Sequence, residues 1–340
     1  MKIALLLIIA GLLNLQTLAQ KEIIHLASLP AEHKVIVKAG DQAFTVFTYP
    51  DTLEKPVLYP IYAADGELIT RGFPAAPRPG DPADHPHHIG LWMNYENVNG
   101  LDFWNNSFAI PADKKNAYGW IRSVQVLKAE GGVKGILIYQ AKWTDQGKNP
   151  LLDENTTFIF RAEGSTRIID RISTLQAEKD VLFKDAKDGF LGLRVAHELE
   201  LPSKDARQYV DDKGNITQVA ATQNSGVTGN YLTSEGKTGD SAWGTRARWC
   251  MLYGKRGADT VSVVIVDNRS NPGYPTYWHA RGYGLFAANP LGQKIFSGGQ
   301  RELNYKLAKG ESVTFKYRVI ITSRNHRLSP NEIDQLSGDF

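Results

Sequence analysis

The chain has 340 residues, with 39 Lys and Arg against 36 Asp and Glu, which gives a formal net charge of +3. Charge this close to neutral, spread along the chain, gives no electrostatic reason to expect a nucleic acid as a partner. The length suffices for a large core, as one β domain or two smaller ones, and the only cysteine, Cys250, cannot form an intramolecular disulfide, so we expect a buried, inert thiol.

Residues 1–19 have the pattern of a secretory signal peptide. Lys2 supplies one positive charge, an apolar run follows from Ile3 to Leu13, and Thr17 to Ala19 ends the segment with small residues. The alternative, a membrane anchor, needs roughly 20 apolar residues, and no later segment reaches 18. We predict that residues 20–340 form one exported domain, periplasmic or extracellular, with no membrane contact after cleavage.

Short extended runs between turn signals make up most of the remaining chain. Ala64-Asp65-Gly66 predicts a hairpin turn, and Gly131-Gly132 and Glu163-Gly164 suit a positive φ. This regular spacing predicts an all-β, antiparallel architecture. The expected strands are Val57–Ala63, Glu67–Arg71, Ile89–Tyr95, Trp120–Lys128, Gly135–Thr144, Thr156–Ala162, Thr166–Ala177, Phe190–Leu201, Arg246–Tyr253, Thr260–Val266, Gly282–Ala287 and Ser312–Thr322.

Two segments depart from this strand pattern. Leu201 to Trp243 is polar and rich in glycine, which fits either a linker between domains or a long loop within one sandwich. Near the C-terminus, Ser329 as N-cap, Pro330 at the first helical position and Glu332 as the partner in a capping box predict a short helix. We expect this helix to cover a sheet edge.

Residues 81–105 concentrate imidazoles, carboxylates and aromatic rings, and we take this stretch as the centre of a polar site. Pro86 favours extended geometry at His85. Alternation along an extended chain would then place His85 and His87 on one side and His88 on the other.

A His-x-His pair on one face can supply two metal ligands, and a divalent metal at His85 and His87 is therefore one hypothesis for this stretch. Imidazoles that bind substrate or catalyse without a metal are a second hypothesis. Histidines that only hydrogen-bond the neighbouring loops are a third. A third metal ligand would come from Asp81, Asp84 or His279.

Asp102 precedes Trp104 by two residues, so both side chains share one side if the backbone is extended. A carboxylate beside an indole can hold a sugar, with its C–H face stacked on the ring and its hydroxyls bound by the carboxylate. Alternatively, Asp102 caps a turn after Asn99-Gly100 and Trp104 fills the core.

Alternation within Phe190–Leu201 would place Arg194, Glu198 and Glu200 on one face and His197 on the opposite, apolar face. We expect Arg194 to line a pocket with Glu198 as its ion partner, which would hold a buried carboxylate ionised. A surface ion pair is the alternative. His197 is more simply a core histidine than a ligand.

Tyr277–Gly284 combines aromatic rings with His279 and Arg281. Glycines on both sides of Tyr283 permit a close backbone approach to a ligand. Asn289 stands before Pro290, which ends the strand. We predict that His279 and Arg281 are functional and converge with the histidine-rich stretch.

The chain resembles the bacterial PmoA-like family, also called methane oxygenase PmoA, in four blocks. The family motif includes Arg194. The blocks are HHIGLWMNYENVNGLDFWN (His87–Asn105), KDGFLGLRVA (Lys187–Ala196), WGTRARW (Trp243–Trp249) and YPTYWHARGYGLFAANPLG (Tyr274–Gly292).

The closing hairpin, KLAKGESVTFKYRVII, and the many antiparallel strands resemble the two-layer supersandwich of galactose mutarotases and related carbohydrate-active proteins. The resemblance implies a concave sheet whose inner face lines a sugar site.

Our leading hypothesis is an exported enzyme that acts on a sugar or sugar-derived molecule, or on an oligosaccharide, by general acid and base catalysis. His88 and His279 would shuttle protons, since the imidazole pKa suits both roles, with Asp102 or Glu198 as the carboxylate. Epimerisation, elimination and hydrolysis all fit, no cofactor is required, and the oligomeric state is open. The expected substrate-binding side chains are His85, His87, Trp92, Trp104, Arg194, Trp243, Trp278, Arg281, Tyr283 and Asn289.

Two other classes of function remain open. A non-catalytic sugar-binding protein would use Trp92, Trp104, Trp243 and Trp278 as stacking platforms. A metal-dependent oxygenase, which the name of the PmoA-like family implies, would need at least three ligands converging on one metal position. Those ligands would come from His85, His87, His88, His279 and a carboxylate.

Overall fold

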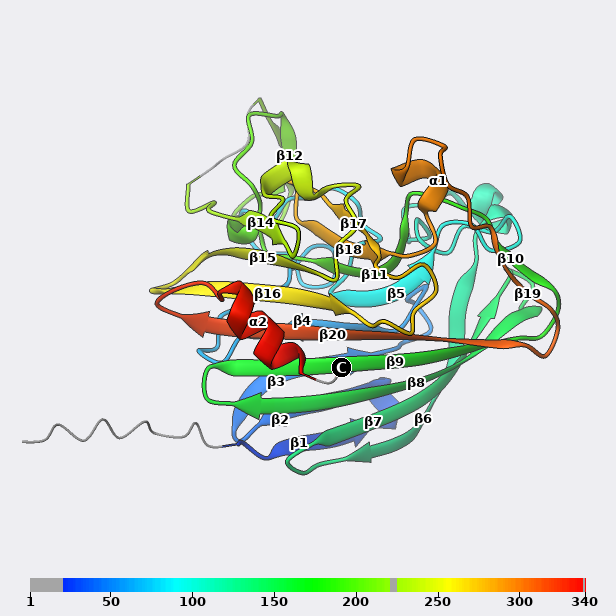
Figure 1. Ribbon diagram of the computed structural model, residues 1–340, viewed down its shortest axis with the longest axis horizontal. Coiled ribbons are helices and arrows are strands. Elements are labelled where there is room, and N and C mark those ends of the chain that lie inside the picture. The colour runs from blue at the N-terminus through cyan, green and yellow to red at the C-terminus, as the bar shows by residue number, and fades with distance from the viewer. Residues whose placement is uncertain (1–20, 221–224, 339) are drawn as a thin grey trace, which may run out of the picture.

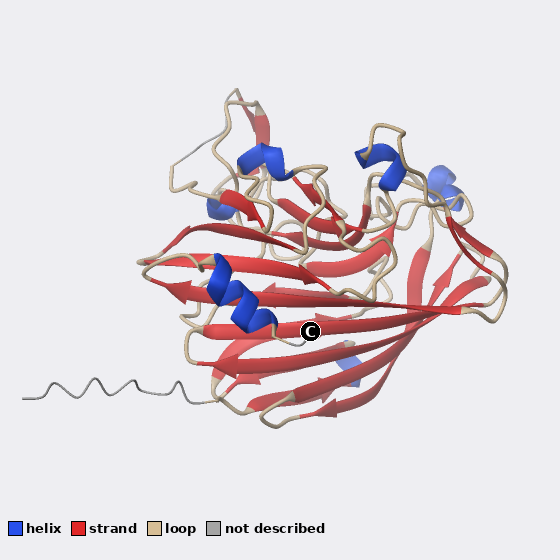
Figure 2. Ribbon diagram, viewed as in Figure 1, coloured by secondary structure: helices blue, strands red, loops and turns tan. Residues whose placement is uncertain are grey.

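The computed structural model describes residues 21–220, 225–338 and 340, and its architecture is two layers of β-sheet (Figure 1). Neighbouring strands in both large sheets run antiparallel. Helices are few and short, so strands dominate the ribbon (Figure 2). The predicted antiparallel, two-layer β-sandwich is confirmed. The predicted signal peptide lies outside the described residues.

Sheet 1 has eight strands in the order β1-β2-β3-β4-β5-β11-β18-β17, so strands from the N-terminal third pair directly with strands from later in the chain. Its strands are β1 (Ile24–Leu29), β2 (Lys34–Ala39), β3 (Gln42–Thr48), β4 (Val57–Ile61), β5 (Leu91–Tyr95), β11 (Gly189–Arg194), β18 (Leu285–Asn289) and β17 (Tyr277–Ala280).

Sheet 2 also has eight strands, in the order β14-β15-β16-β20-β9-β8-β7-β6. Several are long, and burial alternates along β7 and β8 because one face of each strand is turned to the core. Its strands are β14 (Asn230–Thr233), β15 (Trp249–Arg256), β16 (Asp259–Asp267), β20 (Ser312–Arg324), β9 (Thr166–Ala177), β8 (Pro150–Glu163), β7 (Gly135–Thr144) and β6 (Trp120–Glu130).

The remaining elements are two-stranded hairpins or pairs and short helices. None of the helices in the described residues has the length and apolar character that a membrane crossing requires. The strand pairs outside the large sheets are β10 (Val181–Phe183) with β19 (Tyr305–Leu307), and the hairpin of β12 (Arg207–Val210) and β13 (Ile216–Val219). The 3-10 turns are η1 (Pro30–Glu32), η2 (Ala112–Ala117), η3 (His197–Leu199) and η4 (Gly239–Ala242), and the α-helices are α1 (Gln293–Phe296) and α2 (Pro330–Ser337).

Some predicted boundaries are wrong. The expected strand Phe190–Leu201 ends at Arg194 and is followed by the turn η3, so alternation does not continue into Glu198 and Glu200. Leu201–Trp243, left open as linker or loop, carries the β12–β13 hairpin and β14, which is an edge strand of sheet 2. The predicted hairpin turn is confirmed, since Ala63 N donates to the carbonyl of Glu67.

Helix α2 lies on a face of sheet 2 rather than on its edge, crossing β16 and β20 (Figure 1). Ser329 and Glu332 form the predicted capping box. Ile333 of the helix packs with Val264 and Ile320 of the sheet, because the outer face of this part of sheet 2 is apolar. The helix therefore covers surface that would otherwise be exposed to water.

The core between the sheets contains one fully buried ion pair. Arg171 Nη2 lies 2.8 Å from Glu154 Oε1, and their side chains are 2% and 0% exposed. Tyr139 Oη and Trp143 Nε1 also donate to Glu154, at 2.6 and 2.7 Å. Such a pair offsets its desolvation only when additional hydrogen bonds reach the carboxylate, and Tyr139, Trp143 and Thr156 provide them here.

Candidate functional site

The outer face of sheet 1, turned away from sheet 2, carries the site. Register pairs Gly192 with Trp92 and with Ala287, and Ala287 with His279, so these residues form one row across four strands. A Cβ at Gly192 would lie only 2.6 Å from the Trp92 ring and 2.7 Å from the Trp104 ring. Glycine at this position lets both indoles approach the backbone of β11 closely.

Three histidines gather above these indoles in a loop, not on an extended strand. His85 has a φ of 44°, and His88 N donates to its carbonyl at 3.0 Å, which closes a tight turn. The His85 ring stacks on His88 at 4.9 Å and on Tyr283 at 4.7 Å, and His88 stacks on Trp92 at 5.2 Å. The predicted separation of His88 from His85 is therefore wrong, because the turn reverses the expected alternation.

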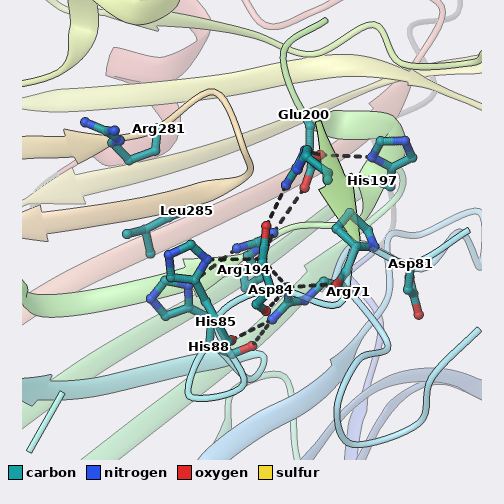
Figure 3. A network of polar contacts seen from close by, with 12 residues as sticks. Arg71, Asp81, Asp84, His85, His88, Arg194, His197, Glu200, Arg281 and Leu285 are labelled. Carbon is teal, nitrogen blue, oxygen red and sulfur yellow. Dashed lines mark hydrogen bonds and ion pairs between the residues drawn. The ribbon is translucent and has the colours of Figure 1, made fainter. Parts of the chain in front are cut away.

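Arg71 holds this loop in place (Figure 3). Its guanidinium donates to four backbone carbonyls, those of Pro82 (3.0 Å), Asp84 (2.7 Å), His85 (3.0 Å) and His88 (3.1 Å). Arg71 is 1% exposed, so its guanidinium needs protein acceptors in place of water, and these carbonyls supply them. One side chain thus fixes the backbone that presents two imidazoles.

Asp84 accepts ion pairs from three guanidinium groups, and Figure 3 labels two of these residues, Arg71 and Arg194. Arg71 Nη1 and Arg194 Nη2 each lie 2.7 Å from Oδ1, and Arg207 Nη2 lies 2.8 Å from Oδ2. Burial alone would raise the pKa of Asp84, but the charges of Arg194 and Arg71 outweigh it and hold that pKa far below its usual range. Asp84 is therefore ionised at any physiological pH.

Glu200, not Glu198, is the glutamate that pairs with Arg194. Arg194 Nη2 lies 3.3 Å from Glu200 Oε1, and Arg207 Nη1 lies 2.6 Å from Oε2. Glu198 instead pairs with Arg256, and its side chain is 39% exposed. The predicted Arg194–Glu198 pair is wrong because η3 rotates the chain after Arg194.

His197, expected in an apolar core position, does not lie on the predicted strand face. It belongs to η3, and its Nδ1 lies 2.9 Å from Glu200 Oε2. The ring also packs against Tyr209, with centroids 5.2 Å apart. It therefore extends the network of Arg194, Arg207 and Glu200 (Figure 3).

His88 carries a proton donor that finds no hydrogen-bond acceptor in residues 21–220, 225–338 or 340. Arg194 Nη1, which can only donate, lies 3.5 Å from His88 Nδ1, so the proton of the neutral ring is assigned to Nε2. Burial lowers the pKa of His88 well below its usual value, and the charges of His87 and Arg194 add to this effect. Within the described part of the chain, Nε2 is buried and has no hydrogen-bond partner.

His279 faces a carboxylate that the sequence analysis did not assign. Its Nδ1 lies 3.5 Å from Asp188 Oδ1, with the side chains 1% and 15% exposed. Burial lowers the pKa of His279 to about 3, helped by Lys187 and Arg281. Burial raises the pKa of Asp188 to about 6, against the opposing charge of Lys187. Asp188 lies in the bend directly before the buried strand β11. This position in the sequence was the available signal that its side chain belongs to the site.

Asp102 caps a turn, as the alternative interpretation held. Its carboxylate accepts from the backbone N and from Nδ2 of Asn105, both at 2.9 Å. Burial raises the pKa of Asp102. Trp104 is fully buried, so it does not share a sugar-binding face with this carboxylate.

The prediction of four stacking platforms is wrong for three of the tryptophans. Trp92, Trp104 and Trp278 are 0% exposed, and Trp278 Nε1 donates to the Ala247 carbonyl at 3.0 Å. Trp243, at 37% exposed, is the exception. The buried indoles support the site from beneath.

Asn289 supports the site rather than facing it. Its Nδ2 donates to the carbonyls of Ala186 (3.0 Å) and Lys187 (2.8 Å), and its Oδ1 accepts from Leu291 N at 3.1 Å. With its polar atoms used in this way, Asn289 holds the turn that carries Asp188.

A pocket of about 500 Å³ opens beside the stacked rings. Trp243, Arg281 and Tyr283, three predicted binding residues, lie in its wall together with Asp84 and Arg207. Tyr283 joins the pocket to His85 through its stacked ring, and Arg281 is close enough to His279 for its charge to lower that pKa. The predicted convergence of Tyr277–Gly284 with the histidine-rich stretch is thus observed. The other lining residues are Leu201, Pro202, Ser203, Asp205, Asp240, Ala280 and Gly282.

The described residues do not assemble the ligand set that a metal centre requires. No group of three or more His, Cys, Asp or Glu side chains among them could hold a metal ion. The rings of His85 and His87 lie 5.7 Å apart at an interplanar angle of 76°, and the His87 carbonyl accepts from Lys55 Nζ at 2.7 Å. The metal-ligand alternative for His85 and His87 therefore lacks a third partner in this part of the chain.

Residues 34–337 match the model of a family described as a family of unknown function, DUF6807. The chain belongs to the DUF6807 family. A comparison with curated proteins gives no match. The match covers sheet 2, all of sheet 1 except β1, the histidine loop and the pocket.

Several solved structures are similar to this DUF6807 protein. They include the GH36 alpha-galactosidase AgaB of Geobacillus stearothermophilus (12% identity, 89% of this chain, TM-score 0.39), a galactose mutarotase related enzyme of Lactobacillus acidophilus (8%, 88% of this chain and 97% of that chain, 0.33) and the Slr1438 protein of Synechocystis sp. PCC 6803 (10%, 92% and 99%, 0.31). The chain spans only 41% of the AgaB chain. One of these structures is named as a galactose mutarotase related enzyme. None of the three names assigns a reaction to the DUF6807 protein.

The clamp at Arg71 leads to a first prediction. Arg71→Lys should lower the free energy of unfolding by about 1.5–3 kcal/mol, because an ammonium group cannot reach all four carbonyls in a fork. Denaturant unfolding measures this loss. Arg248→Lys is the matched control, since Arg248 is 48% exposed and pairs with Asp334 at the surface. It should change the free energy by less than about 0.5 kcal/mol, and equal losses in both variants would contradict the clamp.

Proposed function

We propose that the chain is an exported enzyme that moves protons on a sugar or sugar-derived substrate, with His279 and Asp188 as its acid–base pair. The observation that carries the proposal is the 3.5 Å approach of the buried His279 to the partly buried Asp188, whose pKa values are shifted in opposite directions. At neutral pH, Asp188 is mostly ionised and His279 is neutral, so either can accept a proton.

His88 supplies the complementary donor. A neutral imidazole with a free, buried Nε2–H can hydrogen-bond a substrate oxygen and stabilise negative charge on it without prior loss of a proton. Arg194 fixes the ring orientation through Nδ1. We assign His88 this role rather than that of a proton shuttle.

The pocket supports a sugar-sized substrate. Its volume of about 500 Å³ lies within the usual range for small-molecule sites. Trp243, which is 37% exposed, offers an aromatic face, and Arg281 offers hydrogen-bond donors. Export, which rests on residues 1–19, and membership of the PmoA-like family, which rests on the four sequence blocks, are parts of the same proposal.

The test is incubation of the purified protein with a panel of neutral and acidic sugars and oligosaccharides in D₂O, followed by proton NMR. Epimerisation, elimination and hydrolysis each change the spectrum, and proton transfer at carbon replaces a signal with deuterium. We expect catalysed change in at least one sugar and none with Asp188→Asn. Tight binding of a sugar without any catalysed change would indicate a binding protein instead.

A further inference from the structure

We propose that the substrate carries a carboxylate and that Arg281 binds it, so that the ligand class is a uronic acid or a related acidic sugar. The inference rests on the proposed function of the site, whose substrate it narrows. Its basis is the distribution of charged partners around the pocket.

Arg281 differs from the other arginines of the site because no anion among the described residues pairs with it. Its guanidinium lies over the rings of Trp243, at 6.0 Å, and Tyr283, at 5.7 Å, and faces the pocket. In the described residues it takes part in no ion pair or side-chain hydrogen bond. Arg194 and Arg207, by contrast, are each paired with two carboxylates. A guanidinium held against aromatic faces is suited to bidentate binding of a carboxylate.

Asp84, Glu200 and Asp240 do not compensate Arg281. Asp84 and Glu200 are shared among three guanidinium groups, those of Arg71, Arg194 and Arg207, which leaves this buried network with one excess positive charge. Asp240 lines the same pocket, but its Oδ1 lies against Gly282, 3.2 Å from the position of a Cβ there. It forms no ion pair with Arg281 and is exposed, which suits it to accept from sugar hydroxyls.

A carboxylate on Arg281 would lie beside the acid–base pair. Arg281 follows His279 by two residues, and its backbone N donates to the Leu285 carbonyl at 2.8 Å, which extends the β17–β18 ladder by one step. Residues two apart on a strand share a face, with Cα atoms about 7 Å apart. The carbon next to a carboxylate bound at Arg281 would therefore approach His279 and Asp188.

This placement selects a proton transfer at that carbon. The base takes the proton, the C–H bond breaks, and its electron pair moves into the carboxylate as an enolate, whose charge Arg281 stabilises. Return of a proton to the opposite face inverts the carbon. Alternatively, the electron pair forms a double bond as the oxygen substituent on the next carbon leaves, and that oxygen takes up a proton. Both routes balance without an oxidant or a reductant.

The test compares sugars that differ only at C6. Galacturonate and glucuronate carry a carboxylate where galactose and glucose carry CH₂OH. Titration calorimetry should give at least about tenfold tighter binding of one uronate than of its neutral partner, since a charge-assisted bidentate contact is involved. Arg281→Gln should reduce this preference to less than about threefold. Arg269→Gln, which removes an exposed arginine on the turn after β16, should keep it.

Equal affinity for uronate and neutral sugar in the unmodified protein, or a preference retained in Arg281→Gln, would overturn the inference. Arg281 is exposed, so thermal unfolding should show both variants folded. Uronate binding that depends on Arg281 but leads to no reaction would keep the inference and defeat the catalytic proposal. Turnover of neutral sugars without a uronate preference would keep the catalytic proposal and defeat the inference of an acidic substrate.

Discussion

Asp188→Asn is expected to lower kcat/KM by about 10²–10⁴-fold on any substrate that the protein turns over, which is the usual contribution of a positioned acid or base. The amide cannot take a proton, yet it keeps the size of the side chain and its contact with Asn105. His279→Gln should have an effect of similar size. Steady-state kinetics measures both.

The pH profile separates this role from a structural one. Asp188 acts as a base only when ionised, and its pKa is raised to about 6. Activity of the unmodified enzyme should therefore rise as pH increases through about 6 and fall below it. In Asp188→Asn this rise should disappear from the residual activity. If the residual activity of Asp188→Asn still rose through about pH 6, a group other than Asp188 would be responsible for the rise.

Glu198→Gln is the matched control for the catalytic variants. Glu198 is a predicted catalytic carboxylate, but it pairs with Arg256 and is 39% exposed. Its neutral variant should keep kcat/KM within about threefold, because surface changes away from a site have small effects. If Glu198→Gln lost as much activity as Asp188→Asn, the assignment of the base would be wrong.

The second large effect concerns stability. Glu154→Gln should lower the free energy of unfolding by about 3–5 kcal/mol, because it leaves the Arg171 guanidinium charged and without an anion between the two sheets. Urea unfolding measures this loss. Replacing both partners, in Glu154→Leu with Arg171→Met, should recover much of it, since no uncompensated charge then remains.

The adjacent residue provides the control. Asp153 pairs with Lys142 at 2.6 Å, but both side chains are more than one third exposed. Asp153→Asn should cost about 0–1 kcal/mol, as expected for a surface ion pair. Losses of equal size at positions 153 and 154 would mean that burial does not set the strength of these pairs.

Local pattern was enough to predict most strands of sheet 2 and the capped helix, but it missed β1, β2 and β3, and the expected strand Glu67–Arg71 forms only isolated bridges. Alternation and turn residues are properties of neighbouring positions, so most strands of sheet 2 were predicted close to their observed bounds. The pairing of β11 with β5 and β18 was not predicted. Strand β11 lies about ninety residues after β5 and about ninety residues before β18, and no local signal specifies pairing over such a separation.

The site residues also divide into those that local sequence pattern predicts and those that depend on contacts between distant segments. His279, Arg281, Tyr283 and the histidine-rich stretch were predicted together and lie together. Glu198 was chosen by extending strand alternation past Arg194, where the chain in fact turns through η3 and brings Glu200 to the guanidinium instead. Asp188 was missed because its burial, which raises its pKa, comes from elements distant in sequence.

The β12–β13 hairpin stands outside both layers of the sandwich, yet it carries Arg207 to the edge of the pocket (Figure 1). Surface hairpins tolerate changes of length and sequence that strands within a sheet do not. The base of this hairpin is less free, because the Gln208 carbonyl accepts from Ala83 N and Arg207 pairs with Asp84 and Glu200. A substitution that reshapes this edge of the pocket would therefore also shift the loop that presents the histidines.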